Sequence, residues 1–225
     1  MTQQLQTHFG PVSAVIFDLD GTLLDSMGVW AQIDIDFLGK RGLAVPPDYM
    51  EAITPLGFRA TAEYTKARFS LPDTPEQLMD EWSAMAREMY HHHVQLKPGA
   101  LRLLEELHRR GIPMGAASAL SPELAIPCLE RCGAADYLQV MVTADQVGSG
   151  KHLPEIWLRT AALLGTEPAR CLAADDVAAA IRGARAAGMV TAGLYDPHSG
   201  GREELKASAH LFAESPDELA QQLGI

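Results

Sequence analysis

The sequence predicts an α/β protein with a Rossmann-like, mostly parallel sheet, helices on both faces, and an all-helical cap inserted after the first strand. Two observations carry this prediction. Short apolar runs alternate with amphipathic helical segments through residues 94–225. Residues 26–93, by contrast, contain helical patterns and almost no strand signal. We therefore expect two domains, a core of residues 1–25 and 94–225 and a helical domain of residues 26–93.

Each expected element has its own signal in the sequence. Val12–Phe17 is an apolar, β-branched run that ends abruptly at Asp18, which is typical of a buried strand. In the helical segment, Trp30–Arg41 and Pro75–Tyr90 are amphipathic. The later elements begin or end at Pro, Ser or Gly. They are helix Ala100–Arg110, strand Ile112–Ala117, a helix capped by the Ser121 hydroxyl, strand Tyr137–Val142, helix Pro154–Leu164, strand Arg170–Ala174, helix Ala178–Ala187, strand Met189–Leu194, strand Ala209–Phe212 and a helix starting near Ser215.

Composition limits the classes of partner. The 225 residues carry a formal net charge of -11, so the long-range field repels nucleic acid and anionic membranes. No apolar run reaches the roughly 18 residues of a membrane span, and the N-terminus has no secretion-signal pattern. The three cysteines lack disulfide-framework spacing, and we expect free thiols. We expect a cytoplasmic protein without nucleic-acid or membrane partners.

Polar residues occur where several of the predicted strands end. The carboxyl edge of an open α/β sheet is where ligands bind, so these residues are candidates for one site. The candidate residues are Asp18, Asp20, Ser118, Asp175 and Asp176 at strand ends, with Lys151 just before the predicted helix at Pro154.

Four segments resemble the signatures of the haloacid dehalogenase-like phosphatase superfamily. The first is Asp18-Leu19-Asp20-Gly21-Thr22-Leu23-Leu24-Asp25-Ser26, and the second is Ser118 after a strand. Lys151-His152-Leu153-Pro154-Glu155-Ile156-Trp157 is similar to the family's Lys-x-x-Pro-Asp-x-aromatic stretch, and Cys171–Met189 to its fourth motif and helix. The resemblance extends from Val12 to Gly193, with all four motifs in the family's order.

The resemblance implies a role for each acid. Asp18 is the nucleophile that forms an aspartyl-phosphate, and its other oxygen binds a metal ion. Asp20 is general acid to the leaving oxygen and then general base for water, and its backbone carbonyl also binds the metal. Asp175 and Asp176 supply the remaining carboxylates of a Mg²⁺ site, since Mg²⁺ prefers oxygen ligands.

The other implied roles concern the phosphate and the substrate. Lys151 neutralises the phosphoryl group and holds the nucleophile, and Ser118 binds phosphoryl oxygens together with nearby backbone N–H groups. Gly21 and Thr22 are further substrate-binding candidates. Arg59, in the helical segment, can reach a substrate in similar caps and suits contacts to phosphate or carboxylate.

The expected function is Mg²⁺-dependent hydrolysis of a small phosphate monoester, such as a sugar phosphate. Three alternatives stay open at this point: a sugar-phosphate mutase like β-phosphoglucomutase, a receiver-type signalling domain, and an inactive binding module. Departures from the family pattern motivate the last of these, chiefly Val177 in place of Ser or Thr, and also Ala180 for Gly, Asp175 for Glu and Glu155 for Asp. Val177 removes a hydroxyl that can orient a metal ligand, so activity is expected but reduced.

Overall fold

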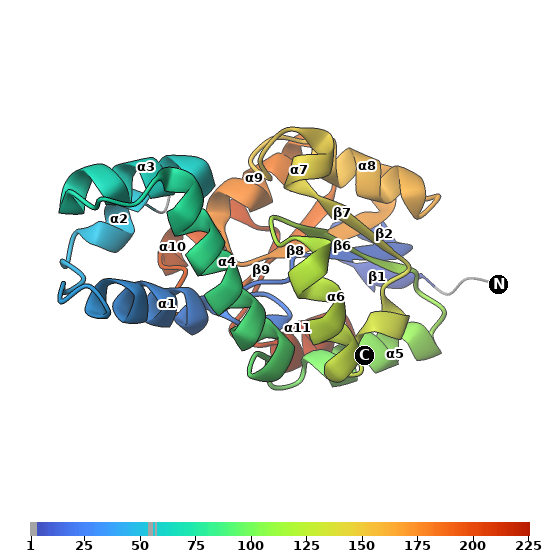
Figure 1. Ribbon diagram of the computed structural model, residues 1–225. Coiled ribbons are helices and arrows are strands. Elements are labelled where there is room, and N and C mark those ends of the chain that lie inside the picture. The colour runs from blue at the N-terminus through green and yellow to red at the C-terminus, as the bar shows by residue number, and fades with distance from the viewer. Residues whose placement is uncertain (1–3, 54–55, 57) are drawn as a thin grey trace. The chain divides into compact units, whose positions relative to one another are not determined.

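The computed structural model describes residues 4–53, 56 and 58–225. The chain divides into two compact units. One, which we call the core unit, comprises Met1–Met27 and Val94–Ile225, and the other, the helical unit, comprises Gly28–His93. Figure 1 shows the strands of the core unit and the helices of both units along the chain.

One parallel sheet of six strands forms the centre of the core unit, in the order β10-β9-β8-β3-β6-β7. All five neighbouring pairs are parallel. This confirms the predicted fold class. The strands are β3 (Ala14–Phe17), β6 (Met114–Ser118), β7 (Val140–Thr143), β8 (Cys171–Asp175), β9 (Val190–Leu194) and β10 (Leu211–Ala213).

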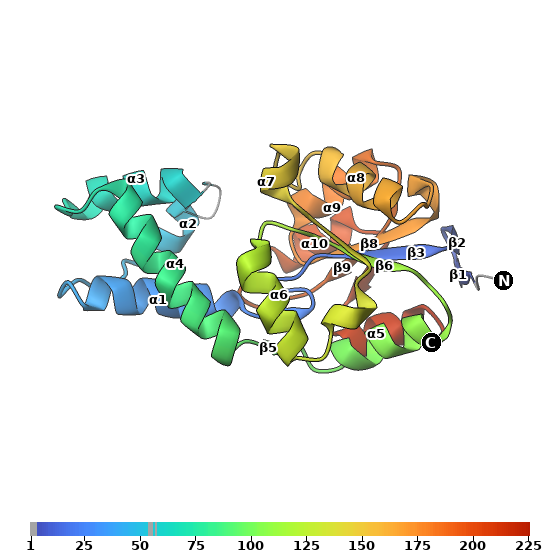
Figure 2. The same cartoon turned by 45° about the vertical axis from the view of Figure 1, so that its right-hand side comes forward.

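Helices cover both faces of this sheet, as Figures 1 and 2 show from two directions. On one face α8 (Glu155–Leu163) packs on β7 and β6, α9 (Ala178–Ala186) packs on β8 and β9, and α10 (Arg202–Ser208) packs on α9. The opposite face carries α11 (Pro216–Gln222), which contacts α5 (Ala100–Arg109), and also α6 (Pro122–Arg131). Every residue of β3, β6, β8 and β9 is buried, which explains why these strands are mostly apolar, with Ser118 and Asp175 as polar residues at strand ends.

Two predicted strands are wrong in part. Val12 belongs to a separate hairpin, in which β2 (Gly10–Val12) pairs antiparallel with β1 (Leu5–Thr7), and Gly10 adopts φ +120°. The apolar run therefore spans two strands with Ser13 between them. At the other position, Ala135–Tyr137 is a 3-10 helix and the strand begins only at Val140; the Tyr137 ring lies 5.4 Å from the His108 ring.

The helix that follows β6 also differs from the prediction. Ser121 is its N-cap residue, but its hydroxyl makes no capping hydrogen bond. The Ser121 carbonyl accepts the first hydrogen bond of the helix, from Ala125 N at 2.9 Å. The other predicted core elements agree with the structure to within two residues at each end. Elements that were not predicted are the short ribbon β4 (Leu24–Asp25) with β5 (Gln95–Leu96), and the helices α7 (Ala144–Val147), η2 (Pro168–Arg170) and α10.

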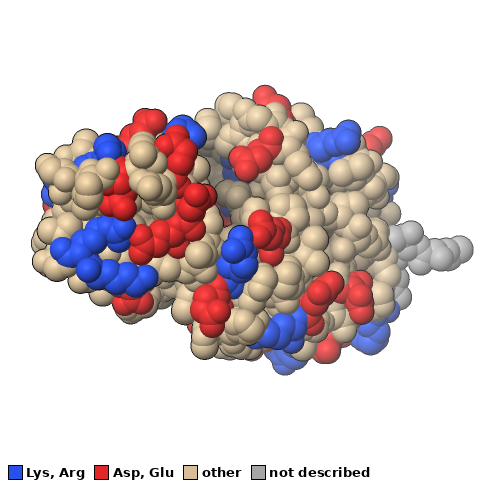
Figure 3. Space-filling model, viewed as in Figure 1, with Lys and Arg blue, Asp and Glu red and all other residues tan. Residues whose placement is uncertain are grey.

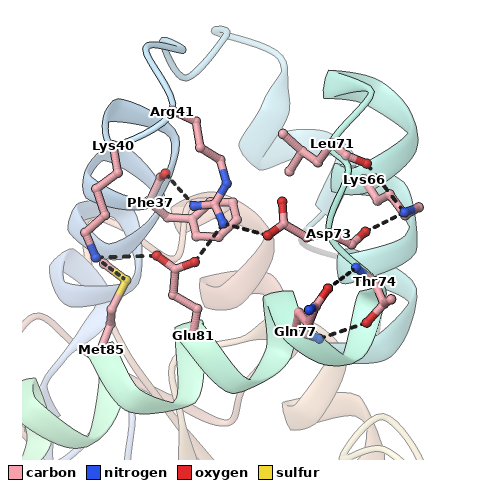
Figure 4. Close-up of polar contacts among 10 residues, drawn as sticks. All are labelled: Phe37, Lys40, Arg41, Lys66, Leu71, Asp73, Thr74, Gln77, Glu81 and Met85. Carbon is pink, nitrogen blue, oxygen red and sulfur yellow. Dashed lines mark hydrogen bonds and ion pairs between the residues drawn. The ribbon is translucent and has the colours of Figure 1, made fainter.

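The helical unit contains no strand among its described residues. Its helices are α1 (Met27–Gly39), α2 (Tyr49–Ile53), α3 (Phe58–Phe69) and α4 (Pro75–His92). Thr74 and Gln77 form a reciprocal capping box at the start of α4. Arg41 joins three segments of the unit, as Figure 4 shows: its Nη2 donates to Glu81 at 2.7 Å and to Asp73 at 3.3 Å, and the guanidinium lies 3.9 Å from the Phe37 ring centroid.

The surface carries charges of both signs. On the face drawn in Figure 3, Lys and Arg side chains are interspersed with Asp and Glu over each unit. Within the described part of the chain, every helix is too short or too polar to cross a bilayer.

Asp34 is a buried acid inside the helical unit, and burial raises its pKa to about 6 from 3.8. A folded-state pKa above the unfolded value means that stability is full below about pH 4 and falls as pH rises through 6. Between pH 5 and 7.5, the free energy of unfolding of the wild-type protein should fall by about 1 kcal/mol because of Asp34, and Asp34→Asn should not show this fall. Urea unfolding of both proteins at the two pH values measures the difference. The exposed Asp36 on the same helix provides the control, Asp36→Asn, which should keep the wild-type pH dependence. Equal pH slopes for Asp34→Asn and wild type would contradict the assignment.

Candidate active site

The order of the strands brings two acidic segments together. β3 and β8 are neighbours, with Phe17 opposite Ala174, so Asp18 and Asp175 follow side by side at the carboxyl edge. Asp18 N donates to Ala174 O at 2.9 Å and fixes this register. The chain runs outward from β3 through β6 to β7 and then returns to β8, so the segments meet where the winding reverses. This is the position at which open α/β sheets bind ligands.

Three carboxylates form the carboxylate cluster, which we define as Asp18, Asp175 and Asp176. Each offers one oxygen that lies within 4.8 Å of the other two. All three residues are buried, with 2%, 0% and 2% of their surface exposed. Carboxylates are rarely buried without a compensating charge, because the desolvation cost of an unpaired ion is several kcal/mol.

Lys151 supplies one positive charge to the cluster. Its Nζ lies 2.7 Å from Asp18 Oδ1 and 2.8 Å from Asp175 Oδ2. The backbone of Lys151 is held from two sides: Trp157 Nε1 donates to its carbonyl at 2.9 Å, and α9 packs against it at Gly183. Three formal negative charges therefore face a single ammonium.

The protonation of the cluster follows from this imbalance. Burial, only partly offset by Lys151, raises the pKa of Asp175 to about 6. Burial, followed by the neighbouring Asp175 and Asp18, also raises the pKa of Asp176 well above its ordinary value. For Lys151, burial lowers the pKa, but the carboxylates of Asp175, Asp18 and Asp176 outweigh it and raise the pKa above the ordinary value. Lys151 is therefore charged at neutral pH.

The turn after β3 is shaped around Asp176. Gly21 adopts φ +76°, and a Cβ there would overlap the Asp176 carboxylate, so both conformation and space require glycine. Thr22 Oγ1 donates to Asp176 Oδ1 at 3.1 Å. The Thr22 hydroxyl is thus directed at the carboxylate cluster. A contact of Gly21 or Thr22 with the substrate stays a prediction.

The remaining candidates lie in different surroundings. Asp20 is partly exposed, and its Oδ1 accepts from Ser26 Oγ at 2.6 Å, so its carboxylate is not a member of the cluster. Ser118 is the buried last residue of β6, next to β3, and its Oγ accepts from Leu120 N at 3.1 Å. Arg59 lies in the helical unit, where its Nη1 donates to Glu76 at 2.7 Å on the surface.

The carboxylate cluster fits a divalent metal ion. Its three buried members present only oxygen ligands, and their charge exceeds that of Lys151. A hard divalent cation supplies the missing positive charge and prefers such ligands. Burial, followed by the neighbouring carboxylates, raises the pKa of Asp176, so metal and proton compete for this carboxylate.

Sequence reasoning missed a second set of residues at the same edge. After β9, Ser199 Oγ donates to Asp176 Oδ2, and the buried Asp196 pairs with Lys97, whose Nζ lies 2.9 Å from Asp196 Oδ2. The signal available was weak: Asp196 and Ser199 follow a predicted strand, as the other site residues do, but they belong to no motif.

A substitution at Gly183 tests how closely the backbone of Lys151 approaches α9. A Cβ at this residue would overlap the Lys151 carbonyl oxygen and lie 2.8 Å from the carbonyl carbon of His152, both backbone atoms that yield little. Gly183→Ala should therefore lower the free energy of unfolding by roughly 1–3 kcal/mol. Gly39→Ala is the control, since a Cβ there meets nothing within 4 Å, and it should stabilise by roughly 0.5–1 kcal/mol. Urea unfolding measures both variants, and a Gly183→Ala protein as stable as wild type would refute the close approach.

Comparisons with known proteins show the family of the chain. A family model described as haloacid dehalogenase-like hydrolase matches residues 12–188. N-acetylmuramic acid 6-phosphate phosphatase of Pseudomonas aeruginosa is 30% identical over 186 residues, 81% of either chain. Fructose-1-phosphate phosphatase YqaB of Escherichia coli is 28% identical over 180 residues, 79% of this chain and 93% of its own.

A solved structure shares the fold of the whole chain. The crystal structure of a putative beta-phosphoglucomutase from Thermotoga maritima superposes with a TM-score of 0.80 at 24% identity, over 95% of this chain and 99% of its own. The family match covers most of the core unit and the whole helical unit. The chain belongs to the haloacid dehalogenase-like hydrolase family.

Proposed function

We propose that this chain is a Mg²⁺-dependent phosphatase that hydrolyses a small phosphorylated metabolite through an aspartyl-phosphate on Asp18. The observation that carries the proposal is the carboxylate cluster, in which Asp18 is buried at the end of β3 and paired with Lys151 at 2.7 Å. A carboxylate beside a lysine and a cation site is arranged for attack on an anionic phosphate.

The proposed substrate class is a sugar phosphate. Two relatives named above are phosphatases for N-acetylmuramic acid 6-phosphate and fructose 1-phosphate, which are both phosphorylated carbohydrates. Selectivity is assigned to residues 26–93, proposed as a cap domain, with Arg59 as a candidate contact to the substrate. A cytoplasmic location is part of the proposal and is supported by three free cysteines.

Asp18 begins the proposed reaction. One of its carboxylate oxygens attacks phosphorus, and the bond from phosphorus to the leaving oxygen breaks. Lys151 Nζ, 2.7 Å from Asp18 Oδ1, holds the nucleophile and offsets the negative charge of the phosphoryl group. At about 4 Å and an effective dielectric of about 20, one such charge pair contributes roughly 4 kcal/mol. Ser118 is proposed to bind a phosphoryl oxygen.

Asp20 is the proposed acid and base. It donates a proton to the leaving oxygen and later accepts one from the water that hydrolyses the aspartyl-phosphate, which regenerates Asp18 and releases phosphate. The hydrogen bond of 2.6 Å from Ser26 Oγ orients the Asp20 carboxylate.

Asp18, Asp175 and Asp176 would hold the metal ion, together with the backbone carbonyl of Asp20. We propose Mg²⁺ because all of these ligands are oxygen atoms. When bound, Mg²⁺ supplies charge neutralisation between nucleophile and phosphate and keeps the two in line.

The alternative functions are less well supported. A receiver domain has its phosphorylated Asp after a later strand, in a chain of about half this length. Here the buried Asp18, paired with Lys151, follows β3, which is the first strand of the central sheet along the chain. Val177 motivates an inactive module, but it replaces no carboxylate of the cluster, and its backbone N donates to Asp175 Oδ1 at 2.8 Å. A sugar-phosphate mutase would use the same core residues and differ in the acceptor, so an experiment must separate it.

Replacing the nucleophile should abolish turnover. Asp18→Asn replaces the carboxylate that attacks phosphorus by a neutral amide, so the rate of phosphate release from an aryl phosphate should fall at least about 10³-fold. Asp25→Asn alters an exposed acid of the same segment and should keep near-normal rates. A near-normal rate for Asp18→Asn would refute its role as nucleophile.

Metal dependence and the acceptor are tested together. With a panel of sugar phosphates, the wild-type protein should release inorganic phosphate with Mg²⁺ and lose this activity in EDTA, because the carboxylate cluster is then left uncompensated. β-Glucose 1-phosphate with a trace of the bisphosphate serves as the mutase assay. Isomer formation faster than phosphate release would show a mutase and contradict the proposed phosphatase activity. Neither isomer formation nor phosphate release with any phosphate tested would favour the inactive binding module.

A further inference from the structure

Asp176 receives its side-chain hydrogen bonds from two hydroxyl groups distant in sequence. Thr22 Oγ1 donates to its Oδ1 at 3.1 Å, and Ser199 Oγ donates to its Oδ2. Asp175 is held differently, by the ammonium of Lys151 and by the backbone N of Val177. Val177, next to Asp176, has no hydroxyl to offer. The direction of the Asp176 carboxylate thus depends on Thr22 and Ser199.

The segment that carries Ser199 is anchored by a buried ion pair. Asp196 is 2% exposed, and its Oδ2 lies 2.9 Å from Lys97 Nζ. Lys97 Nζ also donates to Tyr195 O at 3.1 Å, and its backbone N donates to Leu23 O at 2.8 Å, just after the Asp18–Thr22 turn. The ion pair therefore connects the β9–α10 loop with the chain that leaves the nucleophile.

The anchor also sets the shape of the loop. Asp196 Oδ1 accepts from His198 N at 2.8 Å, and Asp196 O accepts from Ser199 N at 3.2 Å, which forms a tight turn. Gly200 and Gly201 follow with φ of +69° and +57°, a conformation that favours glycine. The turn presents the Ser199 hydroxyl to Asp176, whose carboxylate is in close contact with Gly21 on another side.

We propose that Ser199 is a positioning residue for the metal site, acting through Asp176, and that the Lys97–Asp196 pair holds it in place. This inference rests on the proposed function only in taking Asp176 as a metal ligand. A carboxylate oxygen has two lone-pair sites, so Asp176 can accept from a hydroxyl and still bind a cation. The hydrogen bond from Ser199 fixes the rotation of the Asp176 carboxylate, and a ligand that is already oriented binds a cation more tightly.

The test measures Mg²⁺ binding by isothermal titration calorimetry, with no substrate present. Ser199→Ala should weaken Mg²⁺ binding about 10-fold, the usual range for loss of a group that orients a ligand. Ser199→Thr keeps the hydroxyl and should bind within about 3-fold of wild type. Lys97→Met, which breaks the anchor of the loop, should also weaken binding.

A matched control separates positioning from stability. Ser215 Oγ accepts from Glu218 N at 3.2 Å at the start of α11, so Ser215→Ala also loses a hydroxyl hydrogen bond, but one that does not involve the cluster. Ser215→Ala should lower the melting temperature without Mg²⁺ and leave the Mg²⁺ affinity unchanged. Ser199→Ala should reduce the increase in melting temperature that Mg²⁺ produces, and a purely structural serine would not.

The outcomes are distinct. Wild-type affinity in Ser199→Ala, alongside normal binding and phosphate release by the wild-type protein, overturns the positioning role and leaves the proposed function intact. Equal weakening in Ser199→Ala and Ser199→Thr also overturns it, because the hydroxyl is then not the cause. A wild-type protein that binds no Mg²⁺ removes both the proposed function and this inference.

Discussion

The structure depends on one electrostatic constraint, the burial of three carboxylates around a single ammonium. Asp18, Asp175 and Asp176 are desolvated together, and Lys151 balances one of their three charges. Such an arrangement persists only when each charged group is held by hydrogen bonds or a further cation, since an unpaired buried ion costs several kcal/mol. The parallel sheet provides the rigid frame that holds these groups together.

Nearby features can be understood as consequences of that constraint. Gly21 leaves room for Asp176, and Gly183 lets the Lys151 backbone approach α9. Trp157 binds the Lys151 carbonyl, and Ser199 binds Asp176. Burial, followed by the neighbouring carboxylates, raises the pKa of Asp176, and the excess of negative charge suits a divalent cation. With a divalent cation bound there, the site of a protein with net charge -11 would attract phosphate locally while the overall field is repulsive.

The sequence predicted most of the fold and the acids of the cluster, because both have local signals. An apolar run ending in an acid indicates a strand end, and Asp18, Asp175 and Asp176 were found in this way. Non-local features were not predictable. Ser199 reaches Asp176 only through the turn that Asp196 and Lys97 hold, and nothing local distinguishes Ser199 from a surface serine. The division of the apolar run from Val12 into two strands was missed for the same reason, because the pairing of Val12 with Leu5 decides where β2 ends and β3 begins.

The proposed active site requires a cation among the three buried carboxylates, and crystals grown with Mn²⁺ in place of Mg²⁺ test this directly through anomalous scattering. We predict one strong anomalous peak within coordination distance of Asp18, Asp175 and Asp176, and its loss in Asp176→Asn crystals. An ordered cluster without a peak at millimolar Mn²⁺, or a peak bound elsewhere on the molecule, would contradict it.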